Sequence, residues 1–328
     1  MTVTQSAGAP AVTSPAAVAP LWLRRLYLAN LVAQIGIVVT GGLVRLTGSG
    51  LGCPTWPECV DGSITPVAHQ AESWHRYIEF GNRMLTFVLT ALAIAAAVGT
   101  WSWVRRCKRQ SLSTRRPVVL LAMVPLVGTF AQAFLGGVTV LTGLHPATVA
   151  AHFLLSMALI AGTTVLVTRA AEDADEPVTL TVRPQVRAMA WALVVVAGLV
   201  VILGTVVTGS GPHAGDEDAI RFGVDQRVVA WLHADMVLLF VGLQIGMLLA
   251  VSLTEVPPQV RGRAIHLLGI TVINGLVGYS QLAAGLPWLL VAIHMLLACL
   301  VWVAALRLLL ATRVRGSRAE VAGASVQA

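Results

Sequence analysis

The chain has 328 residues, of which 56% are hydrophobic and only 11% are charged. A soluble domain covers its surface with a larger share of charged side chains, so this composition excludes an ordinary soluble protein. The net charge of +7 could suit a nucleic-acid-binding protein, but the basic residues lie in short clusters between long apolar blocks, which argues against that class.

Eight apolar blocks run along the chain, each close to the roughly 20 residues that a helix needs to cross a hydrocarbon core. None alternates polar and apolar residues like a membrane β-barrel strand, and all are too long for such strands. We therefore predict an all-α integral membrane protein with eight transmembrane helices in two similar four-helix bundles. The predicted helices are 26–46, 76–103, 118–141, 147–169, 186–208, 228–253, 264–283 and 287–311.

Basic residues mark one side of this predicted bundle. Most of the 22 Lys and Arg residues fall in segments on the N-terminal side of the membrane. The positive-inside rule therefore predicts a multi-pass protein of the cell membrane with both termini in the cytoplasm. The basic side would then face anionic lipid.

The segments outside the helices are mostly polar connectors. Residues 1–25 lack the basic start of a secretory signal, and we predict a disordered cytoplasmic tail. Residues 170–185 are predicted to be a cytoplasmic linker between the bundles, with a solvated acidic run at Glu172–Glu176. Residues 312–328 are predicted to form a second cytoplasmic tail.

Short motifs recur at matching places in the two halves. Thr47–Gly50 and Thr208–Gly211 both read TGSG, after the first and fifth predicted helices. His152 and His294 each follow a Gly-Leu pair by nine residues, counted from the glycine. We interpret this as an internal duplication, with an N-terminal bundle at 26–169 and a C-terminal bundle at 186–311. An even number of helices in each half predicts a parallel repeat about the membrane normal.

Three histidines lie five to seven residues inside predicted helices, at one common depth near the outer ends: His152, His233 and His294. An imidazole among lipid chains is costly unless its nitrogens find partners, so these residues are functional candidates. Two imidazoles from different helices can ligate a heme iron from both sides, and we predict that His233 and His294 do so. The alternative is that each histidine forms a separate interhelical hydrogen bond.

The N-terminal bundle has no matching pair. His75 stands at the polar start of the second helix, and Asn82 lies two turns further in on the same face. His75 is therefore the candidate second heme ligand beside His152. Zinc or copper is disfavoured because no carboxylate or cysteine lies at ligand spacing beside these histidines. The other histidines are expected at the interface or in solvent: His69, His145, His213 and His266.

Cys53 and Cys59 flank a short segment of the first outer loop. The outer face of a bacterial membrane is oxidising, so we predict a disulfide between them, with a redox-active dithiol or a free pair as alternatives. Glu79 opens the second helix one turn before Arg83. A local ion pair would explain this carboxylate, and so would proton transfer during the oxidation of a bound substrate.

Several of these motifs together resemble the heme A synthase family over essentially the whole chain. The match comprises Gly41–Gly50, Cys53–Cys59, Ile78–Arg83, Ala151–Phe153, Trp231–His233 and His294. The resemblance implies oxidation of the C8 methyl group of heme O to a formyl group, which gives heme A for terminal oxidase assembly. It implies a heme b cofactor held by His233 and His294, and substrate heme O held by His152. It also implies a catalytic role for Glu79 and a cysteine pair at Cys53 and Cys59.

Two positions depart from the family pattern. The family's second helix carries Glu-x-x-His-Arg, and Asn82 replaces that histidine, so either His75 or no second residue would ligate the substrate heme. The second outer loop has Gly211–Gly215 where some members have another cysteine pair, which excludes a redox role that needs both pairs.

Two alternative functions follow from the same features. One is a di-heme b-type cytochrome that shuttles electrons to or from quinone, and the other is a non-catalytic heme transporter or assembly factor. Candidate partners are membrane lipid, heme O synthase, cytochrome oxidase assembly factors and a second copy of the chain. Nucleic acid is not expected.

Overall fold

The computed structural model describes residues 18–68, 73–112, 116–172 and 178–315. These residues form eight helices, each long and apolar enough to cross a membrane, which confirms the predicted all-α multi-pass membrane protein. The helices are α1 (Leu21–Leu46), α2 (His75–Arg109), α3 (Arg116–Leu141), α4 (Pro146–Ala171), α5 (Pro184–Ser210), α6 (Gln226–Leu253), α7 (Pro258–Ala283) and α8 (Trp288–Ala311). Two short strands, β1 (Val178–Leu180) and β2 (Arg313–Arg315), pair antiparallel.

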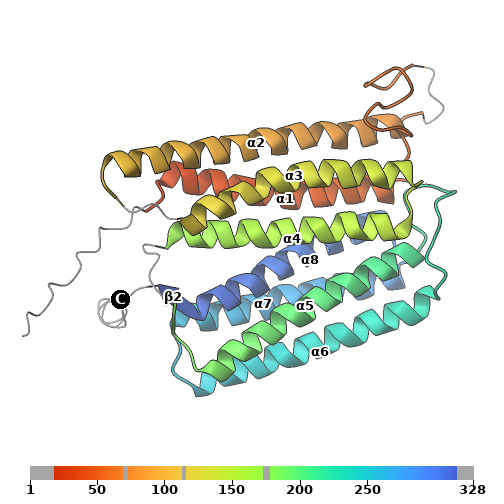
Figure 1. Cartoon of the computed structure of the whole chain (residues 1–328). Helices are drawn as coiled ribbons and strands as arrows, with labels where there is room; N and C mark the ends of the chain where they lie inside the picture. The colour runs from red at the N-terminus through yellow and green to blue at the C-terminus, as the bar shows by residue number, and fades with distance from the viewer. Residues whose placement is uncertain (1–17, 69–72, 113–115, 173–177, 316–328) are drawn as a thin grey trace, which may run out of the picture.

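The helices run alongside one another, so their connections gather at two opposite ends of the molecule (Figure 1). We call these the disulfide end, where α1 joins α2 through Cys53 and Cys59, and the ribbon end, where β1 pairs with β2. Within each half the helices pack in a ring: α1–α2–α3–α4 and back to α1, and α5–α6–α7–α8 and back to α5. In such a ring α2 lies diagonally opposite α4, and α6 lies diagonally opposite α8.

Helix α1 begins earlier than the hydropathy pattern suggests. The predicted tail extends to residue 25, but the chain is helical from Leu21. The reason is packing: Leu23 and Tyr27 are fully buried in a cluster with Trp103 of α2, and this burial stabilises the extra turn. Residues 1–17 of the predicted tail lie outside the described residues.

The two halves meet along α1, α4, α5 and α8. Their interface contains a buried cluster that includes Leu31, Met157 and Cys299, and the indole of Trp302 donates a 2.9 Å hydrogen bond to the Met157 carbonyl. At the disulfide end, the Arg45 guanidinium donates to the Thr208 carbonyl at 2.9 Å. The two halves are therefore joined at the disulfide end by a polar contact, in addition to the apolar packing between them.

The ribbon end corrects two expectations about the linker and the second tail. Glu172, predicted to be solvated, forms ion pairs with Arg169, Arg313 and Arg315. Residues 178–180 and 313–315, predicted to lie in the linker and the second tail, form paired strands, because each supplies hydrogen-bonding partners to the other. Burial lowers the pKa of Arg313, which Glu172 raises and neighbouring arginines lower further. Residues 173–177 and 316–328 lie outside the described part of the chain.

The turns α3–α4 and α7–α8 share an unusual backbone conformation. Gly143 and Leu144 have φ of 59° and 58°, and Gly285 and Leu286 have φ of 76° and 63°. A leucine at positive φ is sterically disfavoured, so its occurrence at both equivalent positions is a specific feature. These turns set the starts of α4 and α8, and thereby the depths of His152 and His294.

Candidate functional site

Four polar side chains occupy equivalent positions in the even-numbered helices. His152 and His294 lie six residues after the first residues of α4 and α8, and Asn82 and His233 lie seven residues after those of α2 and α6. At 1.5 Å per residue, all four are about 9–10 Å along their helices from the disulfide end. The structure thus places an imidazole pair on the diagonal helices of the second half, and an imidazole and an amide on those of the first.

A glycine of the preceding helix faces each of these side chains. A Cβ at Gly136, Gly204 or Gly278 would lie 3.3, 3.4 or 3.2 Å from Cε1 of His152, His233 or His294, respectively. A Cβ at Gly41 would lie 3.7 Å from Nδ2 of Asn82. The missing side chains let each ring or amide rest against a helix backbone.

The hydrogen bonds of the three imidazoles are incomplete. Nδ1 of His294 lies 3.2 Å from the Asn274 carbonyl. Among the described residues, Nδ1 of His152 and of His233 is buried without a hydrogen bond, although the Val200 backbone lies near His233. Buried polar atoms are rarely left unpaired unless a further group completes the site.

Gln132 of α3 supports the His152 turn of α4. Its amide nitrogen donates to the His152 carbonyl at 3.2 Å and to the Ser156 hydroxyl at 2.6 Å. Gln132 precedes Gly136 by four residues, as Asn274 precedes Gly278 in α7. The sequence pattern alone did not point to these α3 and α7 residues. Gln132 and Asn274, like Gly136 and Gly278, are 142 residues apart, the same offset as between His152 and His294.

His75 does not reach the depth of His152. It is the first residue of α2, and Asn82 lies seven residues, or about 10 Å, further along the helix axis. Nδ1 of His75 lies 2.8 Å from the Ser49 hydroxyl, and its ring stacks on Trp74. The same ring lines a surface pocket of about 360 Å³ that also contains Asp216–Asp218.

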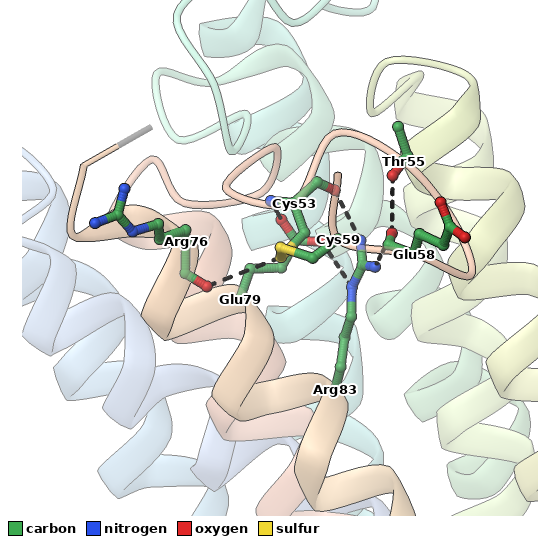
Figure 2. A network of polar contacts seen from close by, with 7 residues as sticks. All are labelled: Cys53, Thr55, Glu58, Cys59, Arg76, Glu79 and Arg83. Atoms are coloured by element: carbon green, nitrogen blue, oxygen red, sulfur yellow. Dashed lines mark hydrogen bonds and ion pairs between the residues drawn. A yellow bond between two sulfur atoms is a disulfide. The ribbon is translucent and has the colours of Figure 1, made fainter. Parts of the chain in front are cut away.

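Cys53 and Cys59 form a disulfide, as predicted, and both are fully buried. Figure 2 shows how α2 holds this loop. One oxygen of Glu79 accepts a 2.6 Å hydrogen bond from the Cys53 amide, and the other pairs with Arg83 at 2.6 Å. Arg83 also donates to the carbonyls of Cys53 and Glu58 at 2.7 and 3.0 Å.

The predicted local ion pair of Glu79 is therefore present, and it belongs to a network that fixes the disulfide loop on α2. Glu79 is only 5% exposed. The loop also contacts α3, because a Cβ at Gly137 would lie 2.5 Å from the Trp56 ring. Gly137 adjoins the glycine that faces His152, so the disulfide loop sits beside the His152 position.

The remaining histidines have structural contacts or lie apart from these positions. His145 precedes α4, and its Nδ1 accepts from the Ala147 amide at 3.3 Å. His213 bonds the Leu286 carbonyl at 2.9 Å, and His266 lies in α7 towards the ribbon end. His69 falls outside the described residues.

The donor set fits heme iron. Two imidazoles on diagonal helices at one depth, each facing a glycine, match the arrangement by which helical bundles hold a heme from both sides. No group of three His, Cys, Asp or Glu side chains that could hold a metal ion occurs in the part of the chain that the structure describes.

Comparison with known proteins decides the family. The model of the COX15-CtaA family, described as cytochrome oxidase assembly protein, matches residues 24–215, more than half of the chain. The chain belongs to the COX15-CtaA family. The matched COX15-CtaA segment contains Cys53, Cys59, Glu79 and His152 and ends before α6.

The chain is also similar to several heme A synthases. The chain is 29% identical over 281 residues to the heme A synthase of Bacillus pumilus, covering 80% of this chain and 87% of that protein. It is 34% identical over 156 residues to that of Shouchella clausii, covering 47% and 48%. It is 30% identical over 157 residues to that of Alkalihalophilus pseudofirmus, covering 47% and 49%. The chain thus spans about half the length of several curated relatives that it matches.

Proposed function

We propose that this protein is a heme A synthase, a membrane oxidoreductase that converts the C8 methyl group of heme O to a formyl group for terminal oxidase assembly. The observation that carries the proposal is the asymmetry of the two halves. In the second half, two imidazoles, His233 and His294, lie at the same depth in the bundle. In the first half, the equivalent positions hold the imidazole of His152 and the amide of Asn82. One half would hold a permanent cofactor and the other an exchangeable substrate.

In this proposal His233 and His294 hold heme b, and His152 holds heme O. The facing glycines support both assignments. Nδ1 of His152 and of His233 has no hydrogen bond among the described residues, which supports them further. Heme b supplies one-electron transfer, while the protein fixes positions and electrostatics. A di-heme cytochrome would need a second histidine at the place of Asn82, so that alternative fits the first half less well.

Glu79 is the proposed proton acceptor during oxidation of the methyl group. It is buried and lies three residues before Asn82 on α2, a rise of about 4.5 Å along the helix. Its ion pair with Arg83 and its bond to the Cys53 amide hold the carboxylate in one orientation. A positioned carboxylate within reach of the reacting group is what proton transfer requires.

We further propose that the ribbon end faces the cytoplasm. Arg169, Arg187, Arg313 and Arg315 gather there, as the positive-inside rule requires. The disulfide end would then face the oxidising side of the cell membrane, where the Cys53–Cys59 bond is stable.

Heme extraction tests the function. The protein is co-expressed with a heme O supply, purified in detergent, and its extracted hemes are separated by chromatography. We expect heme A or hydroxylated heme O in the wild type, and heme b without either product in His152→Ala. A wild type that yields neither product with oxygen and substrate supplied would refute the proposal. If His152→Ala and His233→Ala lose stable heme equally, the cytochrome alternative gains.

A further inference from the structure

Asn82 occupies in the first half the position that His233 occupies in the second. Each lies seven residues into its helix, and each faces a glycine of the preceding helix, Gly41 or Gly204. The helix order that places His233 and His294 on diagonal helices likewise places Asn82 and His152 on diagonal helices. The first half thus has an amide at the place where the second half has an imidazole.

The structure fixes which end of the amide is free. The Thr40 hydroxyl donates a 2.9 Å hydrogen bond to Oδ1 of Asn82. The carbonyl oxygen is thus engaged with α1, whereas Nδ2 has no hydrogen-bond partner in the part of the chain that the structure describes and can donate two N–H groups. A primary amide ligates heme iron far more weakly than an imidazole does, but it is a good hydrogen-bond donor.

His75 does not replace the missing imidazole. It lies about 10 Å nearer the disulfide end than Asn82 along α2, and its Nδ1 is engaged with Ser49. Its ring lines the surface pocket that also contains Asp216–Asp218. Among the described histidines of the first half, His152 therefore is the one that lies at the depth of Asn82.

From this geometry we infer that Asn82 is a hydrogen-bond donor on the open face of the substrate heme. The inference rests on the proposed function. His152 is the single protein ligand to the iron, and Nδ2 of Asn82 donates to the small exogenous molecule that binds opposite. Thr40 is a positioning residue that holds the amide for this contact. The second half would have no such face, because His233 and His294 would both hold heme b.

Carbon monoxide tests the inference because it binds ferrous heme only where an axial position is open. We expect the reduced, heme-loaded wild type to bind one carbon monoxide per chain, and Asn82→His to bind none while gaining a second low-spin bis-histidine signal in electron paramagnetic resonance. Asn82→Leu should still bind carbon monoxide. Its infrared C–O stretch should shift to higher frequency, because the hydrogen bond that weakens the C–O bond is lost.

Two further variants distinguish the loss of the Thr40 hydrogen bond to the Asn82 amide from a general disturbance of the fold. Thr40→Val should shift the C–O stretch in the same direction as Asn82→Leu, because the amide is no longer held. Thr90→Val should leave the stretch unchanged, because Thr90 lies on the same helix as Asn82 and its hydroxyl donates to the Thr86 carbonyl of that helix.

Each outcome bears on a different claim. Two bis-histidine hemes and no carbon monoxide binding in the wild type would show a second histidine ligand and overturn the inference. An unchanged C–O stretch in Asn82→Leu would overturn the donor role alone, with heme A production still measurable. If the first half holds no heme under any condition, the proposed function fails and the inference fails with it.

Discussion

Gly278 of α7 offers the sharpest test of the imidazole sites. A Cβ there would lie 3.2 Å from Cε1 and 3.5 Å from Nδ1 of His294. Favourable carbon–carbon contacts are about 3.5–4.0 Å, so alanine already requires a shift of a few tenths of an ångström. The γ-methyl groups of valine extend roughly 1.5 Å beyond Cβ, so Gly278→Val should displace the ring by about 1 Å.

Such a displacement should weaken heme b binding without unfolding the bundle. Disturbing the groups that orient a metal ligand typically costs about 10–100-fold in affinity, and we expect a loss in that range. Gly269→Val is the matched control, because Gly269 also lies in α7 and a Cβ there would meet no atom within 4 Å. The two substitutions change helix propensity equally, so their difference isolates the contact with His294.

The assay measures the heme-to-protein ratio and the low-spin spectrum of the purified variants, with thermal unfolding in detergent as a check on folding. Full heme b and an unchanged spectrum in Gly278→Val would refute the role of the glycine. Equal heme loss in Gly269→Val would show that the effect is not specific to the ring.

Three further substitutions test the networks at the two ends. Glu79→Gln should lower the free energy of unfolding by about 1–3 kcal/mol and reduce heme A production, because the amide cannot accept hydrogen bonds from both Arg83 and the Cys53 N–H. Thermal unfolding and heme extraction measure these two effects. Glu58→Gln is the control, because its amide oxygen can still accept the hydrogen bond from the Gly62 amide. Cys53→Ser should cost about 2 kcal/mol by opening a short closed loop, and an unfolding temperature equal to that of the wild type would contradict the account. Glu172→Gln should leave the neighbouring arginines without a compensating negative charge. Added salt should therefore raise the unfolding temperature of this variant more than that of the wild type, and the opposite salt dependence would count against the ion-pair network.

The helices were largely predictable because membrane spans impose one composition over a fixed length. The predicted block 118–141 and the observed α3 end at the same residue, and 228–253 likewise matches α6. The early start of α1 was missed because it depends on Leu23 and Tyr27 packing against Trp103, a contact 76 to 80 residues distant in sequence. Hydropathy does not register such long-range packing.

The site residues with distinctive chemistry, such as histidines in apolar helices, could be predicted, but the glycines that shape the site could not. Histidines in apolar helices stand out, and so does the replacement of a histidine by Asn82. Gly136, Gly204 and Gly278 gave no signal of their own, because glycine is common in membrane helices. Glu172 appeared solvated because it begins an acidic run, whereas its partners Arg313 and Arg315 come from the far end of the chain.

The ribbon has a consequence for the order in which the protein is completed during synthesis. β1 precedes α5, but its partner β2 follows α8, and the register pairs Val178 with Arg315. At roughly 5–20 residues per second, β1 waits on the order of ten seconds for β2 to be made, while four helices enter the membrane. Until then Glu172 has Arg169 but neither Arg313 nor Arg315. The pairing of the last strand with the linker thus closes the molecule only after both halves have been inserted.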